Sequence, residues 1–242
     1  MNKYVLGILL CFFALNCKTI SVNQQPQLLT ETPVELGTIG LLNGTVIASN
    51  FETVAIPSFT KGLKLQVLPV TFSKQSFKAY EKANKMYKKG KITFSDTLKV
   101  KPEYTLLQFV DRVAITSELN EAKNTGVRSY LETKQDAQMV TSISIAFSVE
   151  QLNTLKNADE VFLIQSASKK FSLELNILDG KKQILELSDG VVFAYQTSAF
   201  CWKESDRHQL VIADLVSDSE GCPPNTHRKS QKAVQKENYF KL

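Results

Sequence analysis

Histidine, cysteine and tryptophan are scarce in this sequence: its 242 residues include two histidines, four cysteines and one tryptophan. A catalytic site built on an imidazole would have to use His208 or His227. The sequence also lacks the G-x-S-x-G motif of a nucleophile elbow, the P-loop and the G-x-G-x-x-G phosphate site. Glu204 and Asp206 are typical of a solvated turn rather than of a catalytic pair of carboxylates. These absences favour a protein that is not an enzyme and needs no cofactor.

Long hydrophobic runs are also missing, since the most extended one, Tyr4 to Leu15, spans twelve residues. A membrane-spanning helix needs about 20 apolar residues, so this run is too short to cross a bilayer. One positive charge, Lys3, precedes the run, and polar chain follows it. This layout predicts a secretory signal peptide.

The end of this segment, Ala14-Leu15-Asn16-Cys17, stands in the place of a lipobox, and residues 1–17 resemble the start of a bacterial lipoprotein precursor. The usual lipobox has Leu where this sequence has Ala14, and Gly, Ala or Ser where it has Asn16. The resemblance implies cleavage before Cys17, acylation of its thiol and amino group, and a lipid anchor in the cell envelope, most often in the outer membrane. Secretion with cleavage nearby is the alternative.

The chain after Cys17 divides into a spacer and a globular part. Residues 18–33 are polar, rich in glutamine and without helical periodicity, which is typical of a flexible tether. We therefore expect a signal peptide at 1–16, a lipidated N-terminus and tether at 17–35, and one globular domain at 36–242. A division of that domain near residue 117 is the alternative. The remaining chain is long enough to bury a sizeable core.

The other two cysteines, Cys201 and Cys222, form an isolated pair once the signal segment and its Cys11 are removed. An exported protein meets an oxidising compartment, where such a pair forms a disulfide. The alternative is a metal site that adds His208 and His227 to the two thiols. The spacing of the four residues matches no zinc motif, so we expect a disulfide and no metal.

Alternating apolar and polar residues predict an antiparallel sheet. Asn43-Gly44 predicts a hairpin turn, and Asp179-Gly180 and Asp189-Gly190 predict a meander between residues 161 and 195. The other strands are expected at 51–59, 63–72, 92–100, 106–116, 141–147 and 208–216. Helices are expected at 73–89, at 118–134 with an interruption at Gly126, and after a capping box at Ser148 and Gln151. The fold class is α+β, an antiparallel sheet flanked by two or three helices.

The helix predicted at 73–89 carries the clearest binding signal. Its apolar side faces away from a row of lysines, which are Lys74, Lys78, Lys82, Lys85 and Lys89. Such a row would bind anionic lipid headgroups, lipopolysaccharide phosphates or an acidic partner, and the alternative is an ordinary solvated face. With 29 basic and 24 acidic residues the net charge is +5, too small to indicate a nucleic-acid-binding protein.

Together these features predict a lipid-anchored envelope protein that is not an enzyme and acts by binding, as an accessory or assembly subunit with a protein partner in the envelope. One alternative is an envelope hydrolase that acts on glycan, lipid or peptide, with a site at His208 or at a pair of carboxylates. Another is a binder of anionic envelope polymers through the lysine face of residues 74–89.

Overall fold

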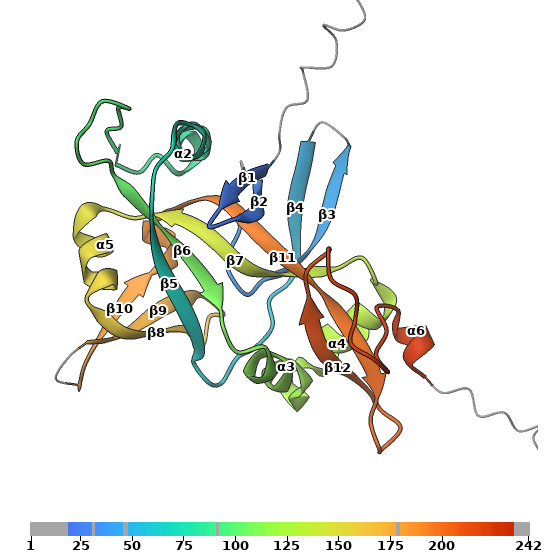
Figure 1. Cartoon of the computed structure of the whole chain (residues 1–242). Helices are drawn as coiled ribbons and strands as arrows, with labels where there is room; N and C mark the ends of the chain where they lie inside the picture. Colours follow the sequence, from blue (N-terminus) through green and yellow to red (C-terminus); the bar gives the residue numbers. More distant parts are fainter. Residues whose placement is uncertain (1–18, 31, 46–47, 91, 178–179, 235–242) are drawn as a thin grey trace, which may run out of the picture.

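A computed structural model of the chain describes residues 19–30, 32–45, 48–90, 92–177 and 180–234. These residues form one sheet of twelve strands, all paired antiparallel, with helices packed on its faces (Figure 1). The predicted α+β class with an antiparallel sheet is therefore confirmed. Five α-helices occur in the described chain, where the sequence predicted two or three.

The strands are β1 (Thr19–Val22), β2 (Gln25–Leu29), β3 (Ile39–Thr45), β4 (Ala48–Ala55), β5 (Leu63–Thr71), β6 (Glu103–Phe109), β7 (Gln138–Ala146), β8 (Ala158–Gln165), β9 (Phe171–Ile177), β10 (Lys181–Glu186), β11 (Val191–Glu204) and β12 (Leu210–Val216). The helices are α2 (Lys74–Tyr87), α3 (Arg112–Asn120), α4 (Thr125–Thr133), α5 (Val149–Lys156) and α6 (Ser230–Ala233).

Strands β7 and β11 form the middle of the sheet, whose order is β1-β2-β11-β7-β6-β5-β8-β9-β10. β12 pairs with the second half of β11, and the hairpin of β3 and β4 joins the first residues of β7. Strands on either side of residue 117 pair within this sheet, β6 with β7 and β5 with β8. Strands from the two sides of residue 117 are therefore neighbours in one sheet.

The sheet carries a hydrophobic cluster on each face, because successive side chains of a strand point to opposite sides. Leu107 of β6 and Val192 of β11 belong to the larger cluster. Leu106 and Phe193, the neighbouring residues, belong to a smaller cluster under α2. The smaller cluster is rich in aromatic rings, and Phe193 lies 5.0 Å from the Tyr104 ring, edge to face. Helix α2 therefore packs on the face of the sheet that carries the smaller cluster, opposite the larger one.

The N-terminal tether predicted for residues 18–33 is wrong within the described residues, because β1 and β2 form a hairpin there. β2 pairs with β11, which places Ile20 and Val22 of β1 in the smaller cluster. The alternation of buried and exposed residues in β1 is present in the sequence, but it covers four residues among polar neighbours. The folded domain therefore includes residues 19–29 and does not start near residue 36.

One predicted strand is absent, and the predicted limits of another strand and of a helix are wrong. The strand expected at 106–116 ends at Phe109, because Asp111 caps α3 by accepting a hydrogen bond of 2.9 Å from the Ala114 N–H. No strand forms among the described residues between 92 and 100. The helix predicted at 118–134 breaks at Glu121, and Gly126 lies inside α4.

Two predicted turns are also misplaced. Asn43 and Gly44 lie inside β3, paired with Asn50 and Ser49 of β4, so the hairpin exists but its turn does not lie at Asn43-Gly44. β8, β9 and β10 form the predicted meander, although Asp179 lies outside the described residues. Asp189-Gly190 does not continue this meander, since β11 pairs with β7 instead of β10.

The capping box predicted at the start of α5 is confirmed. The Ser148 hydroxyl accepts from the Gln151 N–H at 3.2 Å, and the Gln151 side chain accepts from the Ser148 N–H at 3.1 Å. The reciprocal bonds satisfy two backbone donors that the first turn of a helix leaves unpaired. β7 ends at Ala146 and so contains residues 141–146 of the alternating strand predicted at 141–147.

Candidate functional site

Helix α2 presents its lysines to solvent, as the sequence predicted. Ser73 caps the helix and shares a capping box with Ser76, and the buried side of the helix includes Tyr80 and Ala83. Residues 74–89 contain six lysines and one acidic residue, Glu81. The exposed lysines are Lys74, Lys78, Lys82, Lys85, Lys88 and Lys89. We call this set the α2 basic face.

The C-terminal end of α2 is fixed by Asn84. Lys88, rather than the predicted Gly90, ends the helix in the left-handed conformation with φ 52°, and its N–H donates to the Asn84 carbonyl at 2.8 Å. The Asn84 side-chain oxygen accepts from the Lys89 N–H at 3.1 Å. These bonds hold Lys88 and Lys89 in place beside the lysines of the helix.

Tyr80 ties the chain after the helix back to α2. Its hydroxyl donates to the Gly90 carbonyl at 2.9 Å and accepts from the Ile92 N–H at 3.3 Å. Burial is the main cause that raises the pKa of Tyr80, so the hydroxyl stays protonated at neutral pH. A surface hollow of about 920 Å³ lies here, lined by Lys78, Tyr80, Glu81, Lys82, Asn84, Lys85, Lys88, Lys89 and Ile92.

The segment of residues 92–101 packs beside the α2 basic face and exposes apolar side chains. Phe94 stacks on Phe77 of α2 with ring centres 4.8 Å apart, which fixes the segment against the helix. Leu98 and Val100 point into solvent, with exposed fractions of 40% and 86%. Val149 at the start of α5 is 77% exposed, and it lines a shallow pocket together with Leu98 and Val100.

The described chain begins beside this surface. The Gln75 side-chain nitrogen, in the first turn of α2, donates to the carbonyl oxygen of Thr19 at 3.4 Å. Cys17 and the predicted signal segment lie outside the described residues. The position of Thr19 is nevertheless set by the pairing of β1 with β2 and by this contact.

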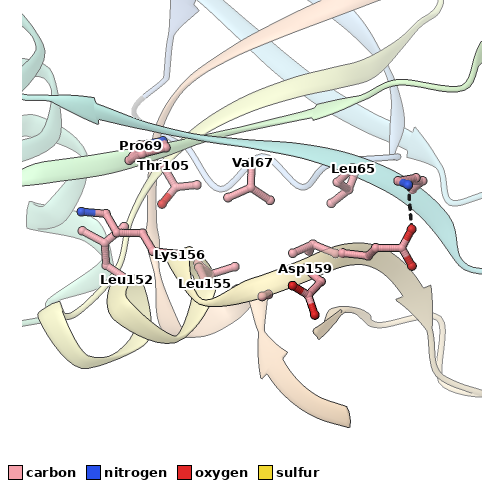
Figure 2. A pocket seen from close by; sticks show the side chains of 12 residues that line it. Leu65, Val67, Pro69, Thr105, Leu152, Leu155, Lys156 and Asp159 are labelled. Atoms are coloured by element: carbon pink, nitrogen blue, oxygen red, sulfur yellow. Dashed lines mark hydrogen bonds and ion pairs between the residues drawn. The ribbon is translucent and has the colours of Figure 1, made fainter. Parts of the chain in front are cut away.

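A second cavity of about 230 Å³ lies between β5 and helix α5 (Figure 2). It exists because β5 pairs with β8 only at Leu63–Leu65, after which the two strands separate. Thr105 of β6 lines it, fully buried, and its hydroxyl has no hydrogen-bond partner among the described residues. Lys64 and Glu160 form an ion pair of 2.7 Å in its wall. Hydrogen bonding to Lys64 is the main cause that lowers the pKa of Glu160.

No local pattern in the sequence indicates this cavity, because its wall combines strands and a helix from distant parts of the chain. Its volume is below the range of about 300–1,000 Å³ that is common for small-molecule sites. The unpaired Thr105 hydroxyl and the charged wall suit ordered water. The α2 basic face is therefore the stronger candidate for a binding surface.

The predicted disulfide joins Cys201 and Cys222, whose Cα atoms are 5.7 Å apart. Both thiols are consumed, so the alternative metal site that needed them is wrong. The described residues contain no group of three or more His, Cys, Asp or Glu side chains that could hold a metal ion. Backbone bonds of 2.7 and 2.8 Å between Trp202 and His227 hold the segment after Cys222 against β11.

His208 lies in the turn between β11 and β12, with φ 55° and a side chain that is 80% exposed. Its Nδ1 atom is 2.8 Å from a carboxylate oxygen of Glu204. An exposed imidazole on a turn provides no enclosed surface to hold a substrate. The geometry therefore gives no support to a hydrolase site at His208.

Comparison with known proteins adds no relative: no family model, no curated protein and no solved structure matches this chain. Among the helices of the described residues, none has the length and apolar character needed to cross a membrane. The functional argument therefore depends on the chain's own residues.

Proposed function

We propose that this protein is a lipid-anchored protein of the bacterial cell envelope that acts by binding, as an accessory or assembly subunit. The observation that carries the proposal is the short distance in sequence between the lipobox-like segment and the folded domain. Cys17 is followed by Lys18 alone before β1 begins at Thr19. Acylation of Cys17 would hold the domain directly at the membrane surface.

The physical basis of the anchor is the burial of acyl chains in the bilayer. Each buried methylene contributes about 0.8 kcal/mol, so two or three chains give stable anchoring where a single one does not. A protein anchored in this way needs no membrane-spanning helix.

A binding role fits the kind of surface that the domain exposes. Leu98, Val100 and Val149 are exposed apolar side chains close to the α2 basic face. Apolar side chains within a charged surface are typical of interaction sites. We expect the partner to be another component of the envelope.

The anchor is tested by the intact, non-reduced mass of the protein purified from the membrane fraction of a bacterial host. We expect a chain that starts at Cys17, heavier by its acyl chains and lighter by two hydrogens for the disulfide. Cys17→Ser should abolish the acylated species, whereas Cys11→Ser should leave it unchanged. A wild-type chain that begins at Met1 without acyl groups would overturn the anchor.

The accessory role is tested by chemical crosslinking in intact cells, followed by purification under denaturing conditions. A reproducible crosslinked envelope protein is the expected result. Recovery of the protein as an uncrosslinked monomer with several lysine-reactive reagents would overturn the role as a subunit.

A further inference from the structure

We propose that the α2 basic face and the neighbouring segment 92–101 form a second membrane contact, which binds the anionic headgroups of the bilayer that holds the lipid anchor. This inference rests on the proposed function and specifies how the domain is oriented on the membrane. The contact combines lysines that meet lipid phosphates with apolar side chains that enter the headgroup region.

The charge of the surface is the first argument. Six lysines and one glutamate give residues 74–89 a net charge of +5, although the whole chain also carries only +5. No ion pair found among the described residues uses Lys78, Lys85, Lys88 or Lys89. Clustered lysines on a membrane-proximal surface are attracted to anionic lipids.

The position of the surface is the second argument. Thr19 contacts Gln75 of α2 through the 3.4 Å hydrogen bond, and β1 lies beside α2 in Figure 1. Two residues of chain reach at most about 7 Å, so an anchor on Cys17 would be attached close to the first turn of α2. An anchored domain would therefore hold the lysines near the headgroups without a long spacer.

The apolar side chains are the third argument. The sequence Leu98-Lys99-Val100-Lys101 alternates apolar and basic residues, and Val100 is 86% exposed. Peripheral membrane contacts combine such apolar side chains, buried at the boundary of headgroups and acyl chains, with lysines. Phe94 fixes this segment on Phe77, and Ile92 lines both the hollow of the lysines and the pocket of Leu98 and Val100, so the apolar and basic side chains adjoin.

A bilayer explains these features better than an acidic protein partner. An acidic partner would account for the lysines, but it would not account for their location beside the predicted anchor. The phosphate of a glycerophospholipid headgroup, present at high density next to Cys17, would satisfy both. The hollow lined by Lys78, Lys85 and Lys88 suits a headgroup phosphate.

The test uses the full-length protein purified from host membranes and mixed with two kinds of vesicle. One is pure phosphatidylcholine, and the other is phosphatidylcholine with phosphatidylglycerol. Co-sedimentation measures attachment, and acetylation of lysines followed by mass spectrometry measures which of them are shielded. With anionic vesicles we expect acetylation of Lys78, Lys85 and Lys88 to slow by about fivefold, which corresponds to the contribution of one lysine at an anionic surface.

The reference lysines are Lys61, Lys181 and Lys203, which are exposed and lie outside α2 and residues 92–101. Their acetylation should not change with either vesicle. High salt should remove the shielding of Lys78, Lys85 and Lys88, because it screens exposed charges.

The outcomes separate the contact from the anchor. Attachment to both vesicles with shielding only on anionic ones supports both proposals. Attachment to both without shielding keeps the anchor and overturns the contact, and it would direct the search to an acidic partner. Attachment only to anionic vesicles, with shielding, keeps the contact and overturns the anchor. Attachment to neither overturns both.

Two variants with the same change in net charge complete the test. Lys78, Lys85 and Lys88 are all reversed to Glu in the first, and Lys61, Lys181 and Lys203 in the second. The first variant should lose the anionic-lipid contribution, by about 100-fold in affinity when lipase has removed the ester-linked acyl chains and left the single amide-linked chain, which alone anchors weakly. The second should bind like the unaltered protein, and equal losses in both variants would overturn the assignment to α2.

Discussion

Ser144 of β7 and Gln27 of β2 lie 117 positions apart in the sequence, and the Ser144 hydroxyl donates a hydrogen bond of 2.6 Å to the Gln27 side-chain oxygen. The Gln27 nitrogen donates to the Ser142 hydroxyl at 3.1 Å. All three residues are buried, so each polar side chain depends on the others for a partner. The N-terminal hairpin is thus joined to the middle of the sheet by polar as well as apolar contacts.

Gln27→Ala should destabilise the protein by about 2 kcal/mol, because it leaves the buried hydroxyls of Ser142 and Ser144 without a partner. Urea unfolding followed by circular dichroism measures the difference. Gln25→Ala is the matched control, since Gln25 is exposed in the same strand and should change stability by less than about 0.5 kcal/mol. Equal effects of the two substitutions would contradict the role of Gln27.

Loss of the Cys201–Cys222 disulfide in the double variant Cys201→Ala and Cys222→Ala should destabilise the protein by about 3 kcal/mol. The sequence separation of 21 sets the entropy that the crosslink removes from the unfolded chain. Thermal unfolding with and without a reducing agent measures the effect. The reducing agent should lower the melting temperature of the unaltered protein and leave that of the double variant unchanged.

Two buried tyrosines should respond in opposite directions when the hydroxyl is removed. Tyr195 has no hydrogen-bond partner for its hydroxyl among the described residues, so Tyr195→Phe should stabilise the protein by about 1 kcal/mol. Tyr80→Phe should destabilise it by about 1–2 kcal/mol, because it removes the bonds to Gly90 and Ile92. Denaturant unfolding of both variants checks the signs, and a loss of stability in Tyr195→Phe would contradict the first.

The buried hydroxyl of Tyr195 should also make the stability of the protein depend on pH in the alkaline range. Burial raises the pKa of Tyr195 from 10.0 to about 12, so the unfolded chain loses this proton before the folded chain does. Its contribution to stability is therefore present below pH 10 and is lost as the pH rises towards 12. Tyr195→Phe should lose less stability over this interval than the unaltered protein, and parallel losses would contradict the assignment.

The buried carboxyl of Glu118 should make the stability of the protein depend on pH in the acid range. Burial alone would raise the pKa of this carboxyl, but hydrogen bonds from Lys123 and from Thr60 outweigh burial and hold it below 4.5. The stabilisation is present above the unfolded pKa and is lost as the pH falls through the lowered folded pKa. Glu118→Gln should reduce the loss of stability at acid pH, by up to about 1.4 kcal/mol per pH unit. The substitution of an exposed residue, Glu121→Gln, should leave this loss of stability unchanged.

The parts of the fold that sequence reasoning predicted are those encoded by short-range patterns. The alternation in β7, the capping box of Ser148 and Gln151, and the lysine periodicity of α2 each involve residues within a few positions of one another. Such patterns determine local structure directly, since side-chain direction follows the period of the strand or helix. The same reasoning gave the meander of β8, β9 and β10, whereas the pairing of Cys201 with Cys222 came from counting the cysteines that remain after the signal segment.

The parts that it missed depend on distant residues. The chain at 19–29 is polar, and its burial follows from β7 and β11, which come more than a hundred residues later. The cavity beside Thr105 arises where β5 and β8 separate, and neither strand shows this alone. The end of α2 at Lys88 depends on the Asn84 side chain, whereas the sequence favoured Gly90 because glycine adopts the left-handed conformation most easily.

The central place of β11 has a consequence for the order in which the chain can fold. β1 and β2 are made well before β11, yet β2 pairs with Ala194 and Tyr195, which lie more than 160 positions further along the chain. Contacts between such distant segments form slowly, because a long loop must close before they add stability. The nascent chain therefore stays without its complete sheet until Val216, the last residue of β12, has been made. Under the proposed function, this incompletely folded chain is the form in which the precursor would be exported.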